Sequence, residues 1–571
     1  MTNRCKAIER LNRVLWGYLL LIVTAGGSPA SARFWTVAPK EIPGIASDEQ
    51  VRTIAEAVSR AQPGDTIVIH AGIYRESVRI DRSGSEDQPI TIRASEGQTV
   101  ILTGADRITD WTKEDSPNED VCSTPWPHRF VSWNKNHTHP GDEFHRLIGR
   151  CEQVFVGGYP LRQVLERDKL TRGTFCIDLD AQRLLVCGYD DRDIAGNKVA
   201  VEASARDRIL SVKGSHIIVQ GLRFRYAANR AQQGAVEFAG NHITVKDCVF
   251  EYTNASGAQF TGENITVRNS TFQHNGQLGF GASRSHGLRM IGCTVRNNNT
   301  KGFDRGWEAG GNKICLARGV ILEDSTFVAN RGNGIWFDIG NEDCIVRHCL
   351  IADNEDAGIF YEISYGLHAH DNVIVGNGLA DSPGAWGAAA GISLSSSPGC
   401  TIERNLLIGN KEGFSLREQQ RSTPKIDGGS EPVWNHDQIV RHNVLAFNRD
   451  AQVWGWFDIG DERHWPKATQ SEQAGDRALA DLNLTFENNL YCPTAGQGLF
   501  HWGVTWKRHE RYRNLEEVRS KLGLDQGSRV AMLSFTNPFA LDLRVPANSP
   551  AISMGCYPRG TVPTVQLGVG P

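Results

Sequence analysis

A short strand pattern that returns about every 23 residues constrains this chain more than any other feature. The pattern is clear at Ile243-Thr-Val245-Lys-Asp247-Cys-Val249-Phe250, and it returns at Ile265 and Leu288. The clean intervals between copies are 22, 23, 24 and 23 residues. Alternating apolar and polar residues indicate strands with one buried face. Other copies begin at Ile217, Val320, Cys344, Leu367 and Cys400, near Gln438, and at Leu484.

Repeats of 20–50 residues are typical of solenoids and propellers. A propeller blade needs about 40 residues, so the shorter period here favours three short strands in each coil. The sequence therefore predicts an all-β fold, a right-handed parallel β-helix. An asparagine follows the strands in seven copies, and we expect each one to occupy a left-handed turn and to stack on the next. These residues are Asn275, Asn298, Asn330, Asn354, Asn377, Asn410 and Asn448.

The cysteines divide into two groups. Three share one position of the repeat: Cys248, Cys293 and Cys349. Serine takes that position in the copies between them, at Ser270 and Ser325, so we expect small buried side chains that stack rather than disulfides. Four others lie outside the repeat, where disulfides are expected in an exported chain and the pairing stays open. They are Cys122, Cys151, Cys176 and Cys187.

Residues 1–32 have the layout of a signal peptide. Four basic residues precede the apolar stretch Val14–Ala25, and Ala30-Ser31-Ala32 forms a small-residue cleavage site. We therefore expect a secreted or periplasmic protein that begins at Arg33, the alternative being an uncleaved N-terminal anchor. The apolar stretch is too short for a comfortable membrane span and none like it follows, so no span is expected after cleavage.

The rest of the chain divides into four parts. We expect residues 33–105 to form an N-terminal cap and the first coils, and 201–492 to form the main β-helix. The cap contains a predicted helix over Asp48–Ala61, whose apolar face covers the open end of the solenoid. That face carries Val51, Ile54, Ala55 and Val58.

Between residues 106 and 200 the repeat disappears, and a small β-rich insertion is predicted. Its strand-like segments are Gln153–Val156, Thr174–Leu179 and Arg183–Cys187. Residues 493–571 are expected to be irregular and to form a C-terminal cap or tail. The formal net charge is −4, and removal of four basic residues and Glu9 with the signal makes it −7. That balance argues against a nucleic-acid partner.

Two carboxylates one repeat apart are the strongest candidates for chemistry. Asp338 ends Gly334-Ile-Trp-Phe-Asp338, and Glu362 ends Gly358-Ile-Phe-Tyr-Glu362, 24 residues later. In stacked coils they would lie one strand spacing apart, roughly 4.8 Å. Retaining glycosidases place their two catalytic carboxyls about 5–5.5 Å apart. Alternation turns Ile335 and Phe337 into the coil and both acids outward, although a bulge would reverse this.

The segment Asn299–Lys313, which is too irregular for a coil, precedes this pair and supplies aromatic and charged side chains. We expect tryptophan to stack on a sugar face, and the charged groups to hydrogen-bond its hydroxyls. The candidate substrate-binding residues are Trp307, Glu308, Lys313, Trp336, Tyr361 and Arg417. His368 and His370 lie in a strand and are interpreted as packing or surface residues.

These motifs resemble a known group of enzymes. Trp307-Glu-Ala-Gly-Gly311 and the two acid motifs are similar to those of the β-helix glycoside hydrolases, particularly β-xylosidase family 120, which also carries a β-rich insertion. The resemblance implies that Asp338 is the nucleophile and Glu362 the acid/base of a retaining hydrolase without a cofactor. The substrate does not carry over from the resemblance; we expect a plant or algal-type polysaccharide or oligosaccharide. The opening segment Ala57–Tyr74 is similar to exported β-helix lyases as well, so it does not discriminate between them.

Two alternatives stay open. A polysaccharide lyase or uronate epimerase on the same fold would need Ca²⁺ or basic side chains to neutralise the uronate. Lys313, Arg305 and Arg417 are available for that, whereas no CxxC or Cys/His cluster predicts a metal site. The other alternative is a non-catalytic β-helix that binds glycans.

Overall fold

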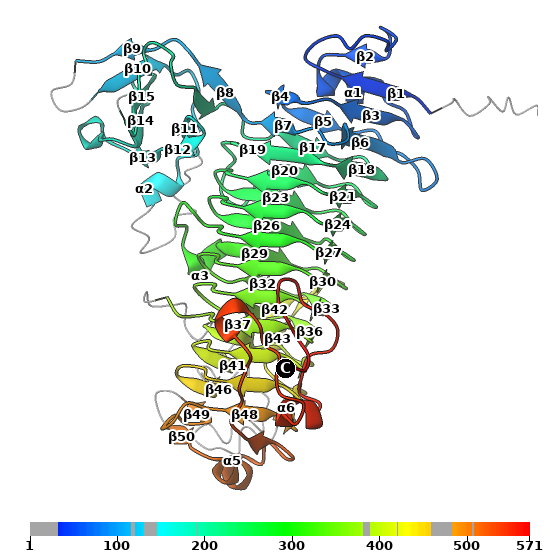
Figure 1. Cartoon of the computed structure of the whole chain (residues 1–571), viewed down its shortest axis with the longest axis vertical. Coiled ribbons are helices and arrows are strands. Elements are labelled where there is room, and N and C mark those ends of the chain that lie inside the picture. The colour runs from blue at the N-terminus through cyan, green and yellow to red at the C-terminus, as the bar shows by residue number, and fades with distance from the viewer. Residues whose placement is uncertain are drawn as a thin grey trace, which may run out of the picture.

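The computed structural model describes residues 32–115, 120–130, 145–190, 192–380, 389–419, 421–457, 482–504 and 508–570. Three long sheets run the length of the molecule and form a parallel β-helix (Figure 1). Sheet A has 14 strands and includes β33; sheet B has 13 and includes β34; sheet C has 13 and includes β32 and β35. The predicted all-β solenoid is confirmed.

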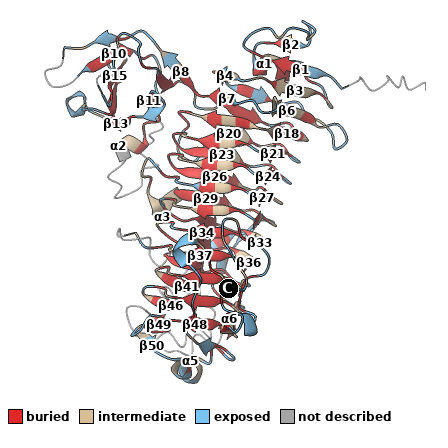
Figure 2. Ribbon diagram, viewed as in Figure 1, coloured by how far each residue is buried: buried red, intermediate tan, exposed pale blue. Residues whose placement is uncertain are grey.

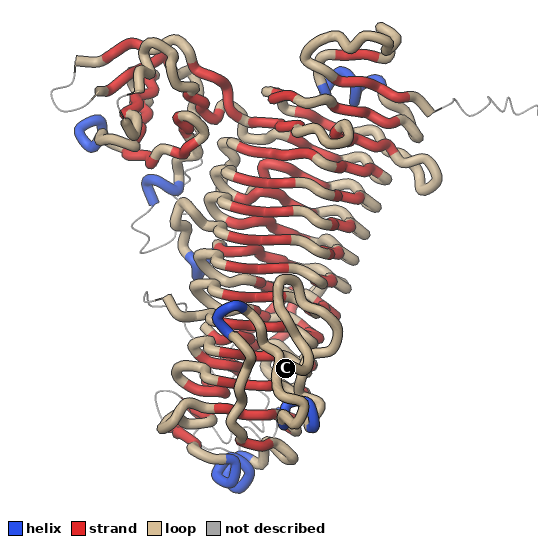
Figure 3. The backbone as a smooth tube through the Cα atoms, in the orientation of Figure 1, coloured by secondary structure: helices blue, strands red, loops and turns tan. Residues whose placement is uncertain are grey.

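One coil contributes a strand to each sheet in turn. The coil that carries the first acid consists of β30 (Ile321–Glu323), β31 (Thr326–Val328) and β32 (Ile335–Asp338). The next consists of β33 (Glu342–Arg347), β34 (Leu350–Ala352) and β35 (Ile359–Glu362). Figure 3 shows these short strands stacked coil upon coil. Sheet C continues from β29 (Gly310–Cys315) through β38 (Ala390–Ser395), β41 (Glu412–Glu418) and β46 (Ala451–Phe457).

The interior of the solenoid is a column of like side chains. Parallel register places Phe224, Phe250 and Phe272 above one another, with ring centroids 5.2 and 4.7 Å apart. All three are fully buried, and buried residues fill the stacked strands in Figure 2. This packing follows from the alternation of the repeat, because every second residue of a strand faces the same side.

The seven repeat asparagines form a hydrogen-bonded ladder at the corner between sheets B and C. The Asn330 side-chain amide donates to the Asn354 side-chain oxygen at 2.9 Å and to the backbone oxygen of Val295 at 3.1 Å. The stacking prediction is confirmed, but the left-handed turn was placed one residue too late. The positive φ belongs to the preceding residue, such as Ala329 (52°) and Asp353 (55°), which turns the asparagine amide inward.

The predicted cysteine column is also confirmed. The backbone N–H of Cys248 donates to Ser270 Oγ at 3.1 Å, and that of Cys293 donates to Ser325 Oγ at 3.0 Å. Outside the repeat, Cys122 and Cys176 are buried thiols, so the structure contradicts the expected disulfides at these two positions. Burial raises the pKa of the Cys176 thiol to about 11.

The N-terminal cap is shorter than predicted. Helix α1 spans only Ile54–Arg60, because Thr53 caps its first turn by accepting from the Glu56 N–H. Val51 belongs instead to β2 (Gln50–Val51), which pairs with β1 (Phe34–Val37) at the end of sheet A. The prediction that Ala55 faces the core was wrong, since it is exposed while Ala57 is buried.

The β-rich insertion leaves the solenoid after β8 (Ala105–Ile108) and returns in β16 (Val201–Ser204). It contains a five-stranded sheet of order β13-β14-β15-β10-β9, and β11 and β12 join β16 and β8 in a four-stranded sheet. The three strand segments expected there are present. The strands of the insertion are β9 (Thr112–Lys113), β10 (Val121–Pro125), β11 (Val154–Val156), β12 (Tyr159–Pro160), β13 (Arg162–Val164), β14 (Thr174–Asp178) and β15 (Arg183–Cys187).

The chain after Cys492 is more regular than predicted. Strand β49 (Phe500–Val504) extends sheet C, β50 (Arg508–Tyr512) pairs antiparallel with it, and α5 (Leu515–Leu522) follows. The final segment, residues 531–570, packs on the outer face of sheet B, where Leu543 and Tyr557 lie in one buried apolar cluster with Leu350 and Leu406. The alternation of β49 went unrecognised because its sequence, Phe-His-Trp-Gly-Val, departs from the repeat.

No helix within the described ranges has both the length and the apolar character needed to cross a membrane. Apart from Ala32, the predicted signal peptide lies outside the described residues.

Candidate active site

Asp338 and Glu362 end two neighbouring strands of sheet C. Phe337 pairs with Tyr361 in parallel register, so the acids that follow them lie on adjacent strands. The backbones of adjacent strands are roughly 4.8 Å apart. Ile335 and Phe337 belong to the core cluster, whereas Trp336 lies in a separate cluster on the outer face. The predicted orientation is confirmed: both acids face outward.

The acids belong to a row of outward side chains, which we call the site row. Cys315 pairs with Asp338, Glu362 pairs with Ser395, and Ser395 pairs with Arg417. The row therefore runs along the solenoid axis as Cys315, Asp338, Glu362, Ser395 and Arg417. One residue comes from each of five successive coils.

The corner that follows sheet C fixes the backbone of this row. Asn341 Nδ2 donates to the backbone oxygen of Asp338 at 2.9 Å, and Ser364 Oγ donates to that of Glu362 at 2.8 Å. The residues after the acids, Ile339 and Ile363, have positive φ values of 59° and 40°. The residues after Cys315 and Ser395 also have positive φ, so this left-handed conformation belongs to the regular corner of each coil.

Asp338 is 7% exposed and is paired with one cation. Lys313 Nζ lies 3.0 Å from Asp338 Oδ2. Asp338 Oδ1 has no hydrogen-bond partner among the described residues, although it is buried. Buried polar atoms are normally satisfied, so an unpartnered carboxylate oxygen marks a place where a ligand would bind.

Lys313 also contacts the loop that precedes it. Its Nζ donates to the backbone oxygen of Trp307 at 2.9 Å and lies 4.2 Å from the centre of the Trp336 ring. Burial opposes its charge, but Asp338 and Glu308 outweigh burial and hold the pKa of Lys313 above its usual value. Lys313 therefore stays cationic beside Asp338.

Glu362 has a different set of partners. Its Oε1 accepts from Arg421 at 2.8 Å, and its Oε2 accepts from the Trp336 indole N–H at 3.3 Å. Burial and the charge of Asp338 raise the pKa of Glu362, and Arg421 and Arg417 limit the rise. One carboxylate is thus held beside a lysine, and the other retains its proton to higher pH, as an acid/base residue requires.

Glu308 ends α3 (Arg305–Glu308), the short helix before β29. Its side chain accepts from Gln232 Nε2 at 2.7 Å, and burial raises its pKa. Trp307 is half-buried and packs beside Phe303 and Ile148, the latter at the end of α2 (His145–Ile148) of the insertion. Strand β29 begins at Gly310, so the irregular segment is shorter than expected and Lys313 lies in a strand.

Two predicted sugar contacts need correction. Tyr361 is fully buried inside the coil, where its hydroxyl donates to the backbone oxygen of Tyr365 at 2.7 Å, so it cannot touch a glycan. Trp336 is only 3% exposed, and its indole contacts Lys313 and Glu362 rather than offering an open face. Arg417 is buried in the site row, with its guanidinium 4.7 Å from the Trp456 ring centre.

Sequence reasoning missed Arg421 and Ser395. Arg421 begins β42 (Arg421–Pro424), which forms a hairpin with β43 (Ser430–Val433) between two coils. The sequence shows that Gln419–His436 is an insertion between two copies of the repeat. The repeat spacing does not predict that a residue of this hairpin contacts an acid two coils earlier. Within the described ranges no group of three or more His, Cys, Asp or Glu side chains is arranged to hold a metal ion.

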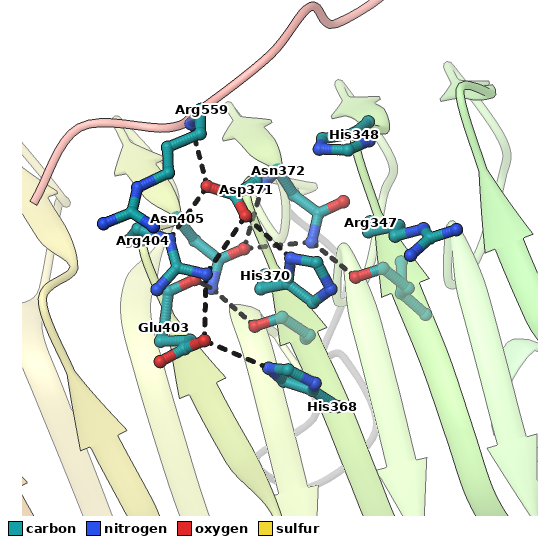
Figure 4. Close-up of polar contacts among 12 residues, drawn as sticks. Arg347, His348, His368, His370, Asp371, Asn372, Glu403, Arg404, Asn405 and Arg559 are labelled. Atoms are coloured by element: carbon teal, nitrogen blue, oxygen red, sulfur yellow. Dashed lines mark hydrogen bonds and ion pairs between the residues drawn. The ribbon is translucent and has the colours of Figure 1, made fainter.

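A second polar cluster lies on sheet A (Figure 4). On β36 (Tyr365–His370), His370 Nδ1 lies 2.7 Å from Asp371 Oδ2, and Arg404 Nε lies 3.1 Å from Asp371 Oδ1. Burial opposes ionisation of Asp371, but His370 and Arg404 outweigh it and hold its pKa well below its usual value. The Arg559 backbone N–H donates to Asp371 at 2.8 Å. This cluster ties the C-terminal segment to the solenoid.

Comparisons with known proteins agree with this architecture. A family model described as the right handed beta helix region matches residues 234–407, and one described as Chondroitinase B matches residues 48–110. A Bacillus subtilis (strain 168) protein, uncharacterized protein YwoF, is 35% identical over 57 residues. That match covers 10% of this chain and 12% of the relative.

Solved structures cover much more of the chain. XylC, solved in complex with xylose, has a TM-score of 0.62 at 17% identity, and the match covers 82% of this chain and 85% of XylC. A structure described as a glycoside hydrolase has a TM-score of 0.49 at 15% identity, covering 68% of this chain and 94% of that one. Together with the family match, the likeness to XylC shows that this chain is a right-handed parallel β-helix.

Proposed function

We propose that this chain is an exported glycoside hydrolase that cleaves a plant or algal-type polysaccharide or oligosaccharide with retention. The observation that carries the proposal is the pair of outward, buried acids on adjacent strands, each with its own cation. Their strand spacing is close to the carboxyl separation of about 5–5.5 Å in retaining enzymes. The similarity of fold to XylC, a structure that contains xylose, supports a carbohydrate substrate.

The two acids divide the work. Glu362 protonates the leaving oxygen while Asp338 attacks the anomeric carbon and forms a glycosyl–enzyme. Water, deprotonated by Glu362, then releases the sugar and regenerates Asp338. Lys313 orients the nucleophile through its 3.0 Å contact, and the raised pKa of Glu362 suits the acid in the first step. The reaction needs no cofactor.

A lyase or epimerase is the second candidate, because three basic side chains surround the acids. Lys313, Arg417 and Arg421 lie where they would neutralise a uronate and leave a base to remove its C5 proton. The match of residues 48–110 to the Chondroitinase B model does not decide between the classes, since β-helix hydrolases and lyases share this opening segment. Against it stands the placement of both carboxylates beside the ring at which the reaction occurs, where they would repel the carboxylate of a uronate.

A panel of aryl glycosides, xylosides and fucosides included, tests the first candidate. We expect wild-type turnover, and Asp338→Asn is expected to lower kcat about 10³-fold or more because the nucleophile is lost. Asp343→Asn changes an exposed acid of β33, and as the matched control it keeps full activity. Silence on every neutral glycoside with ultraviolet-absorbing products from polyuronates would establish the lyase. Silence on both, with unchanged glycan binding in Asp338→Asn, would indicate a binding protein.

A further inference from the structure

Arg421 reaches the site from outside the solenoid. Its side chain is 33% exposed, and its Nη1 donates to Glu362 Oε1 at 2.8 Å and to the neutral Gln419 side chain at 3.4 Å. In the described part of the chain, Glu362 is the one carboxylate that pairs with it. Asp338 is already occupied by Lys313.

The charge of this pair changes with the step of the reaction. To act as the acid, Glu362 must be protonated, and Arg421 then faces a neutral carboxyl group. A partly buried guanidinium without an anion is costly, because its solvation is incomplete. The reactive form of the site therefore has an uncompensated positive charge beside the leaving oxygen.

The site row continues in the same direction. Ser395 follows Glu362, and its Oγ is buried without a hydrogen-bond partner among the described residues. Arg417 comes next and adds positive potential, since its charge lowers the pKa of Glu362. These groups lie roughly 5 and 10 Å beyond the acid, on the side away from the nucleophile.

We propose that Arg421, with Ser395 and Arg417, binds the carboxylate of the departing sugar, so that the substrate carries a uronic acid on the leaving-group side of the cleaved bond. The assignment of this carboxylate to the leaving-group side of the cleaved bond rests on the proposed role of Glu362 as acid/base. An arginine and a carboxylate form a strong, charge-assisted pair with defined geometry. The substrate carboxylate then becomes the anion that pairs with Arg421, a role that ionised Glu362 has in the free enzyme.

Binding of D-glucuronate and D-glucose to the full chain, measured by ligand-observed NMR, tests this without turnover. We expect the wild-type protein to bind glucuronate more tightly than glucose, and Arg421→Met to bind the two sugars equally. Glu362→Gln is the decisive variant: it removes the competing carboxylate, so glucuronate should bind about tenfold more tightly at pH 7. A purely structural Arg421–Glu362 pair predicts no gain.

Titration gives an independent readout. Glu362 is faced by Asp338, Arg417, Arg421, Cys315 and the Trp336 N–H, while Lys313 pairs with Asp338. Glucuronate stays ionised between pH 5 and 8, as α-carboxyl groups do. Its affinity for wild type should therefore rise as the pH falls and Glu362 takes up its proton, whereas in Glu362→Gln the affinity should not change.

Arg331→Met is the matched control, because Arg331 is half-exposed and pairs with Glu355 away from the site row. Equal binding of the two sugars by wild type, or no gain in Glu362→Gln, overturns the inference. Hydrolysis of neutral glycosides that Asp338→Asn abolishes would leave the hydrolase standing in that case. Selective glucuronate binding without any hydrolysis would instead overturn the hydrolase and keep the carboxylate site.

Discussion

At the scale of single residues, the protonation of Glu362 governs the proposed reaction. Burial and Asp338 raise its pKa, and Arg421 opposes that rise. Because the acid acts in its protonated form, kcat/KM falls as the pH rises through this pKa.

Arg421→Met removes a group that lowers the pKa of Glu362. We expect the alkaline limb of kcat/KM on a neutral aryl glycoside to move to higher pH, measured across pH 5–10. The control is Arg331→Met, whose profile should coincide with wild type. If the alkaline limb of the kcat/KM profile stays at the same pH, or moves to lower pH, a group other than Glu362 determines it.

At the scale of elements, the corner after sheet C fixes the backbone of the residues in the site row. Asn341, Ser364, Ser397 and Asn435 each donate to the backbone oxygen of a site-row residue. The first three also donate their backbone N–H to the side chain of the next member in the following coil. Similar ladders elsewhere in the solenoid, such as the asparagine ladder, lie away from the site row. The corner of sheet C combines stability with orientation.

Ser364→Ala tests that distinction. It removes the donor to the Glu362 backbone oxygen and the acceptor for the Asn341 N–H, so we expect a loss of about 1–2 kcal/mol in unfolding free energy. We also expect kcat to fall about tenfold, because misplacement of the acid is costly. Ser270→Ala removes the equivalent pair of bonds in the cysteine column and is the control. Equal kcat in the two variants would mean that the ladder has no part in orientation.

The sequence predicted those elements that obey the repeat. The orientation of Asp338, the asparagine ladder and the cysteine column all follow from a two-residue alternation and a constant coil length. Arg421 was beyond reach because a hairpin has no fixed register with the coils that it leaves. Tyr361 was misjudged as a sugar contact although its alternation turned it inward.

At the scale of the whole molecule, the C-terminal segment shields one side of the solenoid. The outer face of sheet B is apolar in its later coils, and residues 531–570 cover it. Contacts with Asp371 and with the backbone oxygen of Met554, which faces His442, hold the segment in place.

A chain that ends at residue 530 should expose this face and associate, because large apolar patches drive self-association. Light scattering after size exclusion is expected to give an apparent mass roughly double that of the full chain, or more. Tyr557→Asp, which disturbs the segment without deleting it, should show a smaller effect in the same direction. An unchanged mass in both would indicate that the coils need no cover.

The order of the site residues along the chain also sets the time at which chemistry becomes possible. Coils of a solenoid contact only their neighbours, and chains fold from the N-terminus as they are made. Asp338 is synthesised 24 residues before Glu362, and Arg421 comes 59 residues after Glu362. A growing polypeptide therefore holds the proposed nucleophile for 24 residues before it gains the proposed acid, and it must extend by a further 59 residues before Arg421 can pair with that acid.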